Sequence, residues 1–307
     1  MSELPEAPAK PDARPFRSGM IAIVGRPNVG KSTLLNRILQ EKIAITSKTP
    51  QTTRHRILGV RTLPAAQLVL LDTPGIHKPK YRLNQRMVQV ALESIQGADL
   101  ILLLVEASEQ PGAGDRYTIQ AIKKARVPVI LVINKMDLVK KNELLPLMDL
   151  FRKEHDFAEL IPVSALTGEN VDHLVENMVR YIPEGGPLYP EDTLTDQPMR
   201  ALTSEIIREK ILQRTREEIP YAVAVLLEEF REEEAKNLTV IKATILVERT
   251  SQKRIIIGEG GRMLKEVGQE ARAELEAKLG RKVYLELWVK VRKNWRQDER
   301  ILRELGY

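Results

Sequence analysis

The stretch 25–33 reads "GRPNVGKST" and decides the fold of the first part of the chain. It matches the pattern G-x-x-x-x-G-K-[ST], in which backbone N–H groups wrap a chain of phosphates. The run 20–25, "MIAIVG", precedes it as a buried strand would, and 31–40, "KSTLLNRILQ", follows with helical apolar spacing. A glycine-rich turn that merely caps a helix is the alternative. The strand before the loop and the helix after it favour a phosphate site, because a helix N-terminus adds partial positive charge there.

Individual side chains of this loop have predicted roles in holding a nucleotide. We expect Lys31 to reach the β- and γ-phosphates and Ser32 to bind Mg²⁺. The predicted phosphate-binding residues are the loop itself and one later glycine: Gly25, Arg26, Pro27, Asn28, Val29, Gly30, Lys31, Ser32, Thr33 and Gly75.

A second motif, "DTPG" at 72–75, ends the apolar run "AQLVLLD". Asp72 closes this predicted strand and would hold Mg²⁺ through water. Gly75 would offer its N–H to the γ-phosphate, because it has no Cβ to block a close approach. By itself "DTPG" is an ordinary turn, but its place after a phosphate loop and at a strand end favours the functional interpretation.

The residue after this motif departs from a common pattern. Many GTP-hydrolysing proteins have a glutamine there, which orients the attacking water. Here it is Ile76, which has no hydrogen-bonding group in its side chain. His77 comes next and could reach a water, but a role in a mobile loop is the safer interpretation. We therefore expect slow intrinsic turnover and a helper group from elsewhere.

Two further motifs predict guanine as the base. "NKMD" at 134–137 closes a buried strand, and the Asp137 carboxylate can accept hydrogen bonds from the N1–H and the exocyclic amine of guanine. Adenine offers neither donor, so an ATP-using RNA enzyme is disfavoured. "SAL" at 164–166 ends the next strand, where the Ala165 N–H could meet the guanine oxygen. The predicted guanine-binding residues are Asn134, Lys135, Asp137, Ser164, Ala165 and Leu166.

The order of these segments predicts an α/β domain over residues 19–182. Its apolar runs, such as 98–107 and 128–135, are nearly continuous and alternate with helical patterns. This arrangement is typical of a mostly parallel sheet covered on both faces. Residues 1–18 read as a disordered lead-in without the apolar core of a signal peptide.

A proline-rich stretch, 183–198, predicts a linker, and the pattern changes after it. We expect a smaller α+β domain over residues 199–307. Its expected elements are helices at 199–215, 262–280 and 298–306, an antiparallel pair at 221–230 and 238–249, a strand at Ile255–Ile257, and a half-buried strand at 282–293. Pro146 is expected either to lie in the first turn of the helix over 142–157 or to kink it.

The sequence "GEGG" at 258–261 indicates how this second domain acts. A G-x-x-G loop leading into a helix is how KH domains clamp a nucleic-acid backbone, although the motif alone is weak. Further on, "KVRKNWR" at 290–296 has four basic residues and no acid, and Trp295 is expected to stack on a base or ribose. The alternative places Trp295 in the core. The predicted RNA-binding residues are Ile257, Gly258, Glu259, Gly260, Gly261, Arg262, Lys290, Arg292, Lys293 and Arg296.

Charge and composition agree with a polyanionic partner. The chain has 307 residues, a net charge of +6 and no cysteine, so it has neither disulfides nor thiolate sites. Residues 253–307 carry 14 Lys and Arg against 9 Asp and Glu. No apolar run approaches the ~20 residues that span a bilayer. We expect a cytoplasmic protein.

Together the four motifs resemble those of the translation-factor-related small GTPases. The stretch "TPQTTRHRI" at 49–57 narrows this resemblance to the bacterial GTPase Era family, which it matches from about Met20 to the C-terminus. The resemblance implies a P-loop GTPase domain followed by a KH domain of type II. It implies a GTP-hydrolysing switch that binds the 3′ end of small-subunit ribosomal RNA and assists maturation of that subunit.

The resemblance also implies a metal site and two switch loops. In the family a threonine closes over Mg²⁺; Thr52 and Thr53 are both candidates, and Thr53 is favoured because it directly precedes Arg54. With Ser32 and Asp72 it would form the Mg²⁺ site. The predicted switch residues are Thr52, Thr53, Asp72, Thr73, Pro74, Gly75 and Ile76.

An asparagine in the phosphate loop is the helper that the resemblance suggests. In related GTPases with an apolar residue after "DTPG", an asparagine at the position of Asn28 helps to bind K⁺. The cofactors expected are therefore Mg²⁺ and K⁺, with GTP as substrate. We expect a monomer. The rival hypothesis is a nucleotide-regulated GTPase that docks to a membrane or a protein, since family members associate loosely with the inner face of the cell membrane.

Overall fold

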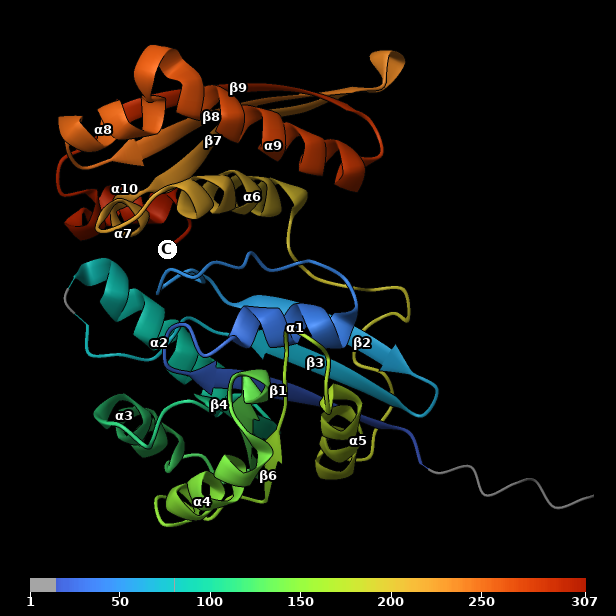
Figure 1. Cartoon of the computed structure of the whole chain (residues 1–307). Helices are drawn as coiled ribbons and strands as arrows, with labels where there is room; N and C mark the ends of the chain where they lie inside the picture. The colour runs from blue at the N-terminus through green and yellow to red at the C-terminus, as the bar shows by residue number, and fades with distance from the viewer. Residues whose placement is uncertain (1–14, 80) are drawn as a thin grey trace, which may run out of the picture.

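The chain folds around two β-sheets that lie in separate layers of the molecule (Figure 1). The computed structural model describes residues 15–79 and 81–307. The first sheet has six strands in the order β2-β3-β1-β4-β5-β6, and the second has three in the order β7-β8-β9. This confirms the predicted combination of a mostly parallel α/β domain and a smaller α+β domain.

The first domain alternates strands and helices. Strand β2 is antiparallel to β3, whereas all other neighbouring pairs are parallel. Its elements are β1 (Arg17–Gly25), α1 (Lys31–Leu39), β2 (Ile57–Leu63), β3 (Ala66–Asp72), α2 (Arg82–Gln96), β4 (Leu100–Glu106), α3 (Ala113–Ile122), β5 (Val129–Asn134), α4 (Lys141–Arg152), β6 (Glu159–Pro162) and α5 (Val171–Tyr181).

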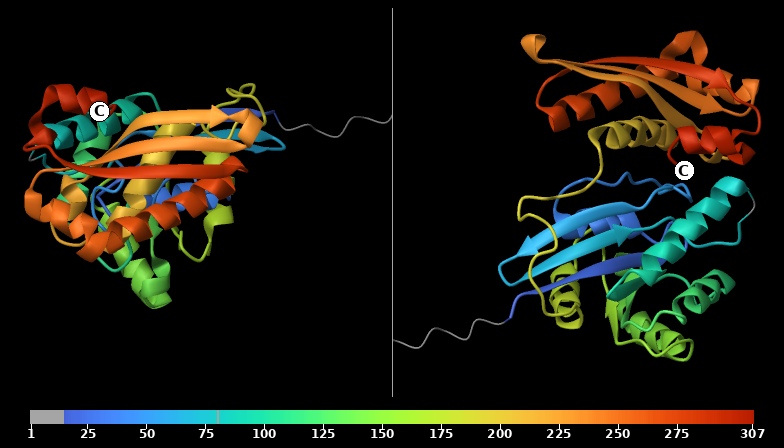
Figure 2. Two further views of the ribbon diagram at one scale, coloured as in Figure 1. Left: turned by 90° about the horizontal axis from the view of Figure 1, so that it is seen from above. Right: turned by 180° about the vertical axis from the view of Figure 1, so that it is seen from behind.

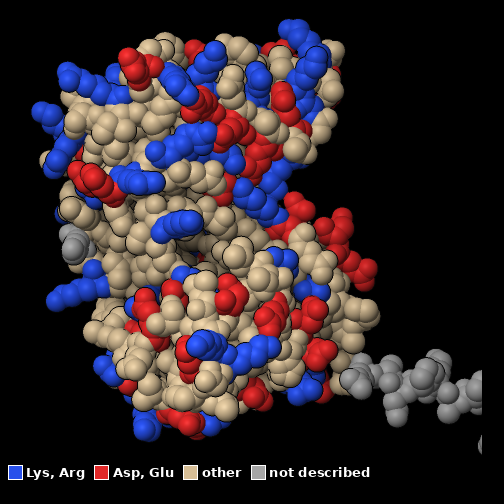
Figure 3. Space-filling model, in the orientation of Figure 1, with Lys and Arg blue, Asp and Glu red and all other residues tan. Residues whose placement is uncertain are grey.

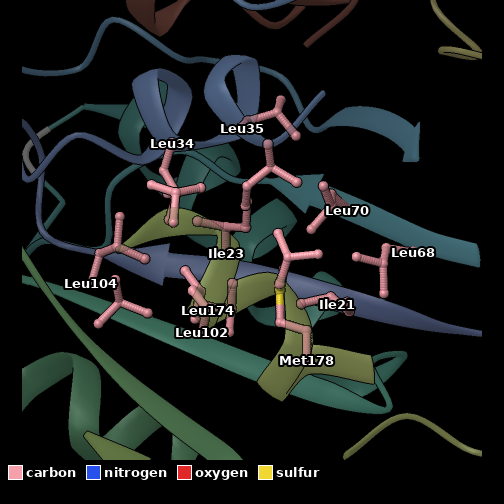
Figure 4. Packing of buried hydrophobic residues seen from close by; sticks show 14 of the residues in the cluster. Ile21, Ile23, Leu34, Leu35, Leu68, Leu70, Leu102, Leu104, Leu174 and Met178 are labelled. Carbon is pink, nitrogen blue, oxygen red and sulfur yellow. The ribbon is translucent and has the colours of Figure 1, made fainter. Parts of the chain in front are cut away.

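Helices cover both faces of this sheet. Leu34 and Leu35 of α1 and Met178 of α5 pack on one face against inward residues such as Ile23 (Figure 4). Helices α2, α3 and α4 cover the other face, where Phe151 is buried. Burial on both faces explains why the strands read as unbroken apolar runs, and it aligns the carboxyl ends of β1, β3 and β5 at one edge, where ligands bind in such folds.

Of the two alternatives expected for Pro146, a place in the first turn of its helix is wrong, and a kink stays a prediction. Pro146 lies beyond the first turn of α4, in the interior of a helix that continues to Arg152. A proline in a helix interior costs about 3 kcal/mol. Burial of Leu144, Leu147 and Phe151 against the sheet offsets that cost.

Residues 183–198 form no helix or strand of their own. They first contact the start of β1 and Gln67 of β3, and they reach the outer edge of β2 at Leu194 and Thr195. The Val60 N–H donates to the Leu194 carbonyl over 2.8 Å, and the Thr195 hydroxyl donates to the Leu58 carbonyl over 2.6 Å. Edge strands expose unpaired backbone groups. This strap, as we call residues 183–195, satisfies part of that edge and thereby fixes the path of the chain between the two domains.

Helices α6, α8 and α9 of the second domain pack apolar side chains against its small sheet (Figures 1 and 2). Strand β7 is antiparallel to β8, and β8 is parallel to β9. The elements are α6 (Met199–Arg214), α7 (Ile219–Ala222), β7 (Ala224–Glu233), β8 (Leu238–Val247), α8 (Thr250–Ile257), α9 (Arg262–Leu279), β9 (Lys282–Val291) and α10 (Glu299–Glu304).

The predicted strand at Ile255–Ile257 is wrong, because these residues end helix α8. Three successive isoleucines favour a strand by propensity, but tertiary packing overrides such preferences. Gln252 and Ile256 are the buried residues and are four positions apart, as one face of a helix requires. The Gln252 side chain also accepts hydrogen bonds from the N–H groups of Glu248 and Arg249, both over 3.0 Å, which caps the helix start.

A second correction concerns the start of the antiparallel pair. Tyr221 and Ala222 belong to the short helix α7, and β7 begins only at Ala224. Pro220 near the start of α7 suits a helical first turn, because the amide hydrogen that it lacks would have no partner there.

The two domains meet through α6, α7 and α10 of the second and α2 and the loop after α1 of the first (Figure 1). An apolar cluster crosses this boundary and joins Leu83 and Met87 of α2 to Leu246, Trp295 and Leu302. The domains therefore share a small core in addition to polar contacts.

Candidate nucleotide site and nucleic-acid interface

The phosphate loop, residues 25–33, lies between β1 and α1, as predicted. Gly30 has a φ of +97°, and a Cβ there would collide with the Asn134 side-chain amide. Gly25 is equally constrained, because a Cβ would lie 2.5 Å from the Leu104 carbonyl oxygen. Both glycines are therefore required by the tight passage of the backbone between neighbouring strand ends.

Lys31 is buried inside this loop. Its Nζ donates to the carbonyl oxygens of Arg26 over 2.9 Å and Gly25 over 3.3 Å. Burial lowers the pKa of Lys31 to about 8, although the nearby Asp72 carboxylate opposes this shift. Phosphate groups held by the loop would add negative charge and so favour the ammonium form.

Three oxygen-bearing side chains converge beside Lys31. Ser32 Oγ donates to Asp72 Oδ2 over 2.6 Å and lies 2.7 Å from Thr53 Oγ1, which is itself 3.2 Å from Asp72 Oδ2. Asp72 is fully buried, and burial raises its pKa, whereas Lys31 lowers it. Its Oδ1 atom has no hydrogen-bond partner among the residues that the structure describes. An orphaned carboxylate oxygen beside two hydroxyls fits a hard cation such as Mg²⁺.

Of the two candidate threonines, Thr53 lies at this cluster. Thr52 Oγ1 instead donates to the Thr49 carbonyl over 2.7 Å, within its own turn. Thr53 is 7% exposed. No group of three or more His, Cys, Asp or Glu side chains gathers within residues 15–79 and 81–307. A cation here would therefore need phosphate and water oxygens to complete its ligands, as Mg²⁺ sites at nucleotides do.

The second switch segment, residues 72–77, packs directly on the phosphate loop. A Cβ on Gly75 would lie 2.6 Å from the Pro27 nitrogen, so only glycine fits there. Thr73 Oγ1 donates to the Ile23 carbonyl over 2.8 Å. Ile76 is 1% exposed, and its side chain belongs to the core under α2 and α3.

His77 has partners within the protein. Its Nδ1 is 2.8 Å from the Gly75 carbonyl, and its Nε2 lies 2.9 Å from the Gln51 amide nitrogen and 3.1 Å from that of Asn84. The two amides donate, so Nε2 accepts and the Nδ1–H donates to the Gly75 carbonyl. His77 thus connects the second switch segment to the first switch segment, residues 46–56.

The predicted guanine-binding residues gather at the carboxyl ends of β5 and β6. Asn134 is 2% exposed; its Nδ2 donates to the Val29 carbonyl over 2.7 Å and its Oδ1 accepts from the Ala165 N–H over 2.9 Å. It therefore ties the phosphate loop to the Ser164–Leu166 loop. The predicted bond from the Ala165 N–H to guanine would have to share or replace this one.

Lys135 and Asp137 lie at the rim of the same site. The Lys135 ammonium contacts Glu106 over 2.5 Å, and its backbone has a left-handed φ of 63°. Asp137 is exposed, so its carboxylate is accessible to a base. The Arg37 guanidinium, which the sequence did not single out, donates to the Ala165 carbonyl over 3.1 Å and supports the loop from behind.

In the second domain the glycine turn, residues 258–261, joins α8 to α9. Gly258, Gly260 and Gly261 have φ values of 73°, 57° and 81°. A Cβ on Gly258 would lie 2.8 Å from Met263 Cβ, whereas Gly260 and Gly261 face open space. The N–H groups of Gly258 and Gly261 donate to the carbonyls of Arg254 over 2.9 Å and Gly258 over 3.2 Å. The open side of the turn, at Gly260 and Gly261, is where a phosphate backbone can approach.

The basic residues predicted to accompany the turn divide into two groups. Within the part of the chain that the structure describes, Arg292 and Lys293 are exposed without an ion-pair partner, whereas Arg262 pairs with Glu266 over 3.0 Å and Lys290 with Glu228 over 3.1 Å. Figure 3 shows Lys and Arg at the end of the domain where α8 lies and also across the rest of this face.

One prediction for the segment 290–296 is wrong, and a second residue of the segment, Arg296, has partners at the domain boundary. Trp295 is fully buried and donates its Nε1–H to the Ala222 carbonyl over 2.8 Å, so the prediction that it stacks on a base is wrong. The alternative, a core tryptophan, is right. Arg296 pairs with Glu248 and lies over the Tyr81 ring at 4.2 Å, at the domain boundary rather than at the glycine turn.

A phosphate loop with a guanine motif, followed by a glycine turn between two helices, defines the class of GTPases that carry a C-terminal KH domain. Residues 20–135 match the family described as "50S ribosome-binding GTPase", and residues 218–296 match "KH domain". The chain is 54% identical to the GTPase Era of Geobacter metallireducens over 95% of this chain and 98% of that protein, and 52% identical to that of Syntrophus aciditrophicus over 95% of each. The chain belongs to the GTPase Era family and is a GTP-hydrolysing enzyme.

Solved structures agree with this assignment. Era in complex with MgGDPNP and nucleotides 1506–1542 of 16S ribosomal RNA superposes with a TM-score of 0.93 at 48% identity, covering 95% of this chain and 99% of that one. A single-substitution variant of Aquifex aeolicus Era bound to GDP·AlF4⁻ superposes with a TM-score of 0.92 at 48% identity and the same coverage. The rival hypothesis of a membrane- or protein-docking GTPase is not favoured.

Proposed function

We propose that this protein is a GTP-dependent switch that binds the 3′ end of small-subunit ribosomal RNA and assists maturation of the small ribosomal subunit. The carrying observation is the glycine turn of the KH domain, which has three positive-φ glycines and faces open space at Gly260 and Gly261. A relative that covers the same length has been solved with nucleotides 1506–1542 of 16S ribosomal RNA.

For the nucleotide, we assign Ser32, Thr53 and Asp72 to Mg²⁺ and Lys31 to the phosphates. What supports this is the convergence of the three oxygens and the unpartnered Oδ1 of Asp72. The bound metal would neutralise charge on the transferred phosphoryl group. Asp137 recognises the guanine edge, and Asn134 holds the two loops that flank the base.

Asn28 is proposed to help bind K⁺ next to the phosphates. Its side chain is exposed and its Nδ2 donates to the Lys48 carbonyl over 2.7 Å, which places the amide oxygen beside the first switch segment. Hydrolysis rates in K⁺ and Na⁺ test this proposal. We expect faster hydrolysis in K⁺, and we expect Asn28→Ala to abolish the difference while GTP binding persists. Equal rates of the unchanged protein in both salts would contradict a role for K⁺.

The decisive experiment compares RNA affinity in two nucleotide states. Binding of a 3′-terminal fragment of 16S ribosomal RNA is measured with a non-hydrolysable GTP analogue and with GDP, with a scrambled RNA of equal length as control. We expect tighter binding in the analogue state. Equal affinities would contradict a nucleotide-dependent switch, and equal binding of the scrambled RNA would contradict recognition of that sequence.

The site of action is proposed to be the cytoplasm, and the protein is proposed to act as a monomer. Within the described residues, none of the helices is long and apolar enough to cross a membrane. A loose peripheral attachment to the inner face of the cell membrane would rest on basic charge alone, and flotation with anionic vesicles, compared with neutral ones, tests it.

A further inference from the structure

The two neighbours of Thr53 are both held by the KH domain. On one side, Arg208 of α6 donates through Nη2 to the carbonyl oxygen of Thr52. Arg208 is 1% exposed, and Glu205, one turn earlier on α6, orients it through bonds of 2.9 and 2.5 Å. A paired arginine fork of this kind has little freedom to move.

On the other side, Arg54 extends into the KH domain. Its guanidinium donates to the carbonyl oxygens of Val223 over 2.7 Å, Pro220 over 3.1 Å and Tyr221 over 3.3 Å. These carbonyls belong to the short helix α7 and the residue after it. Carbonyls at a helix end have no partner within the helix, so Arg54 supplies one from the other domain.

The environment of Arg54 makes this contact dependent on the KH domain. Arg54 is 3% exposed, and burial lowers its pKa. Within the described residues no carboxylate lies within 4.0 Å of it, so backbone carbonyls, the Tyr307 hydroxyl at 3.4 Å and the Trp295 ring at 5.7 Å compensate its charge. A buried charge of this kind is tolerated only while all of these partners stay in place.

We propose that Arg54 and Arg208 are positioning residues for GTP hydrolysis, through which the KH domain holds Thr53 at the cation site. This inference rests on the role of Thr53 in the proposed function. The backbone of three consecutive residues is fixed at both flanks by the second domain, and the side chain between them points to Ser32 and Asp72. A KH domain that shifts by a few ångströms would release Thr53.

The coupling has to act in both directions, because linkage between two binding events is reciprocal. Closure of Thr53 over the nucleotide-bound cation favours the domain arrangement with Arg54 among the α7 carbonyls. In turn, a ligand that stabilises this arrangement strengthens binding of the triphosphate. The guanine-binding residues are held by other contacts, so GDP affinity should depend little on either arginine.

Two variants and two matched controls test the proposal on the full chain. Arg54→Lys keeps the charge but loses the planar fork that serves three carbonyls. Arg208→Met combined with Glu205→Gln removes the contact to Thr52 without leaving a buried carboxylate unpaired. The controls are Arg56→Ala, two residues along the first switch segment, and Arg216→Ala, just beyond α6; both side chains are exposed. Thr53→Ala is the reference for a lost metal contact.

The readouts are the Mg²⁺ concentration needed for half-maximal binding of a GTP analogue, GDP affinity, and KM and kcat separately. We expect Thr53→Ala and both arginine variants to raise the Mg²⁺ requirement and lower kcat by about tenfold each, with GDP affinity unchanged. Arg54→Lys combined with Thr53→Ala should be no worse than Thr53→Ala alone, because both act on one contact.

The outcomes separate this inference from the proposed function. If Thr53→Ala changes the Mg²⁺ requirement and both arginine variants do not, positioning by the KH domain is wrong while the metal site stands. If Thr53→Ala has no effect, the proposed metal role of Thr53 itself is wrong. If the arginine variants weaken GDP and the analogue equally, or add to Thr53→Ala, their role is general stability and the inference is overturned.

Discussion

The backbone N–H of Ile76 donates to the carbonyl oxygen of Gly25 over 3.1 Å, which ties the second switch segment to the first residue of the phosphate loop. The bond sets the direction of the side chain, which enters the core under α2 and α3. The missing catalytic glutamine is therefore a matter of backbone geometry as well as of side-chain chemistry.

Restoring a glutamine at this position should fail. We expect Ile76→Gln to hydrolyse GTP no faster than the unchanged protein, because the new amide would be buried away from the phosphates. It should also lose about 1–3 kcal/mol of stability, the cost of an unpaired buried amide. Chemical denaturation and single-turnover hydrolysis measure the two effects. Ile76→Val is the size control and should lose about 0.5–1.5 kcal/mol. Faster hydrolysis by the glutamine variant would show that the segment can turn outward.

Nucleotide affinity should depend on pH through Lys31, whose pKa burial lowers to about 8. Bound phosphates favour the charged ammonium form of Lys31. Where Lys31 is neutral in the nucleotide-free protein, it therefore has to take up a proton when the nucleotide binds. Below pH 8 the ammonium is already charged and affinity should be flat; above pH 8 it should fall, by about tenfold per unit at most. Fluorescent GDP titrations at pH 7, 8 and 9 check this. Lys31→Arg, which stays protonated, is the control, and the same fall in that variant would assign the titration to another group.

The glycine turn can be tested with a substitution whose control has the same backbone. We expect Gly260→Asp to weaken RNA binding at least about tenfold, since a carboxylate repels phosphate where the open turn meets it. Gly280→Asp is the matched control. Gly280 has a φ of 64° and Gly260 a φ of 57°, and a Cβ added at either position would have no described atom beyond its chain neighbours within 4 Å. It ends α9 at the opposite end from the turn. Filter binding measures both. Equal losses would place the RNA elsewhere, and GTP hydrolysis without RNA should be unchanged in both variants.

The stability of the domain boundary should depend on Glu209, which is fully buried. It accepts from the Lys42 ammonium over 2.5 Å and from the Thr46 N–H over 2.8 Å, across the two domains. We expect Glu209→Gln to lower the free energy of unfolding by about 1–2 kcal/mol. The loss is kept this small because the Lys42 side chain is 37% exposed and water screens the pair. Urea unfolding of the full chain measures this. In the control, Glu270→Gln, the broken pair with Arg214 is exposed and should cost less than about 0.5 kcal/mol. Equal midpoints for the two variants would contradict a role for burial.

The sequence was sufficient for the nucleotide half of the molecule, because its motifs act through the backbone at strand ends. Gly25, Gly30 and Asp72 lie where their spacing predicts, and Thr53 rather than Thr52 reaches Ser32. Their environment is set by strands whose pairing follows directly from continuous apolar runs.

Elsewhere the sequence misled where long-range packing decides. Ile255–Ile257 favour a strand locally, yet Ile256 is buried from a helix. Trp295 lies among basic residues, yet its ring fills the boundary core and its N–H finds the Ala222 carbonyl. Arg54 and the Val223 carbonyl, and Arg208 and the Thr52 carbonyl, are more than 150 residues apart along the chain. The only sign of the contact between Arg54 and the KH domain in the sequence was the position of Arg54 directly after Thr53.

The strap along β2 has a consequence for how the KH domain can move. Its last edge contact is at Thr195, and α6 begins at Met199, so only a short tether lies between a fixed point and the moving domain. Even fully extended, the chain from Thr195 to Met199 reaches only about 14 Å. While the strap holds, the KH domain can pivot about this point but cannot travel away from it. Any nucleotide-driven rearrangement is therefore a rotation about this point. It displaces the start of α6 little and the distant glycine turn more.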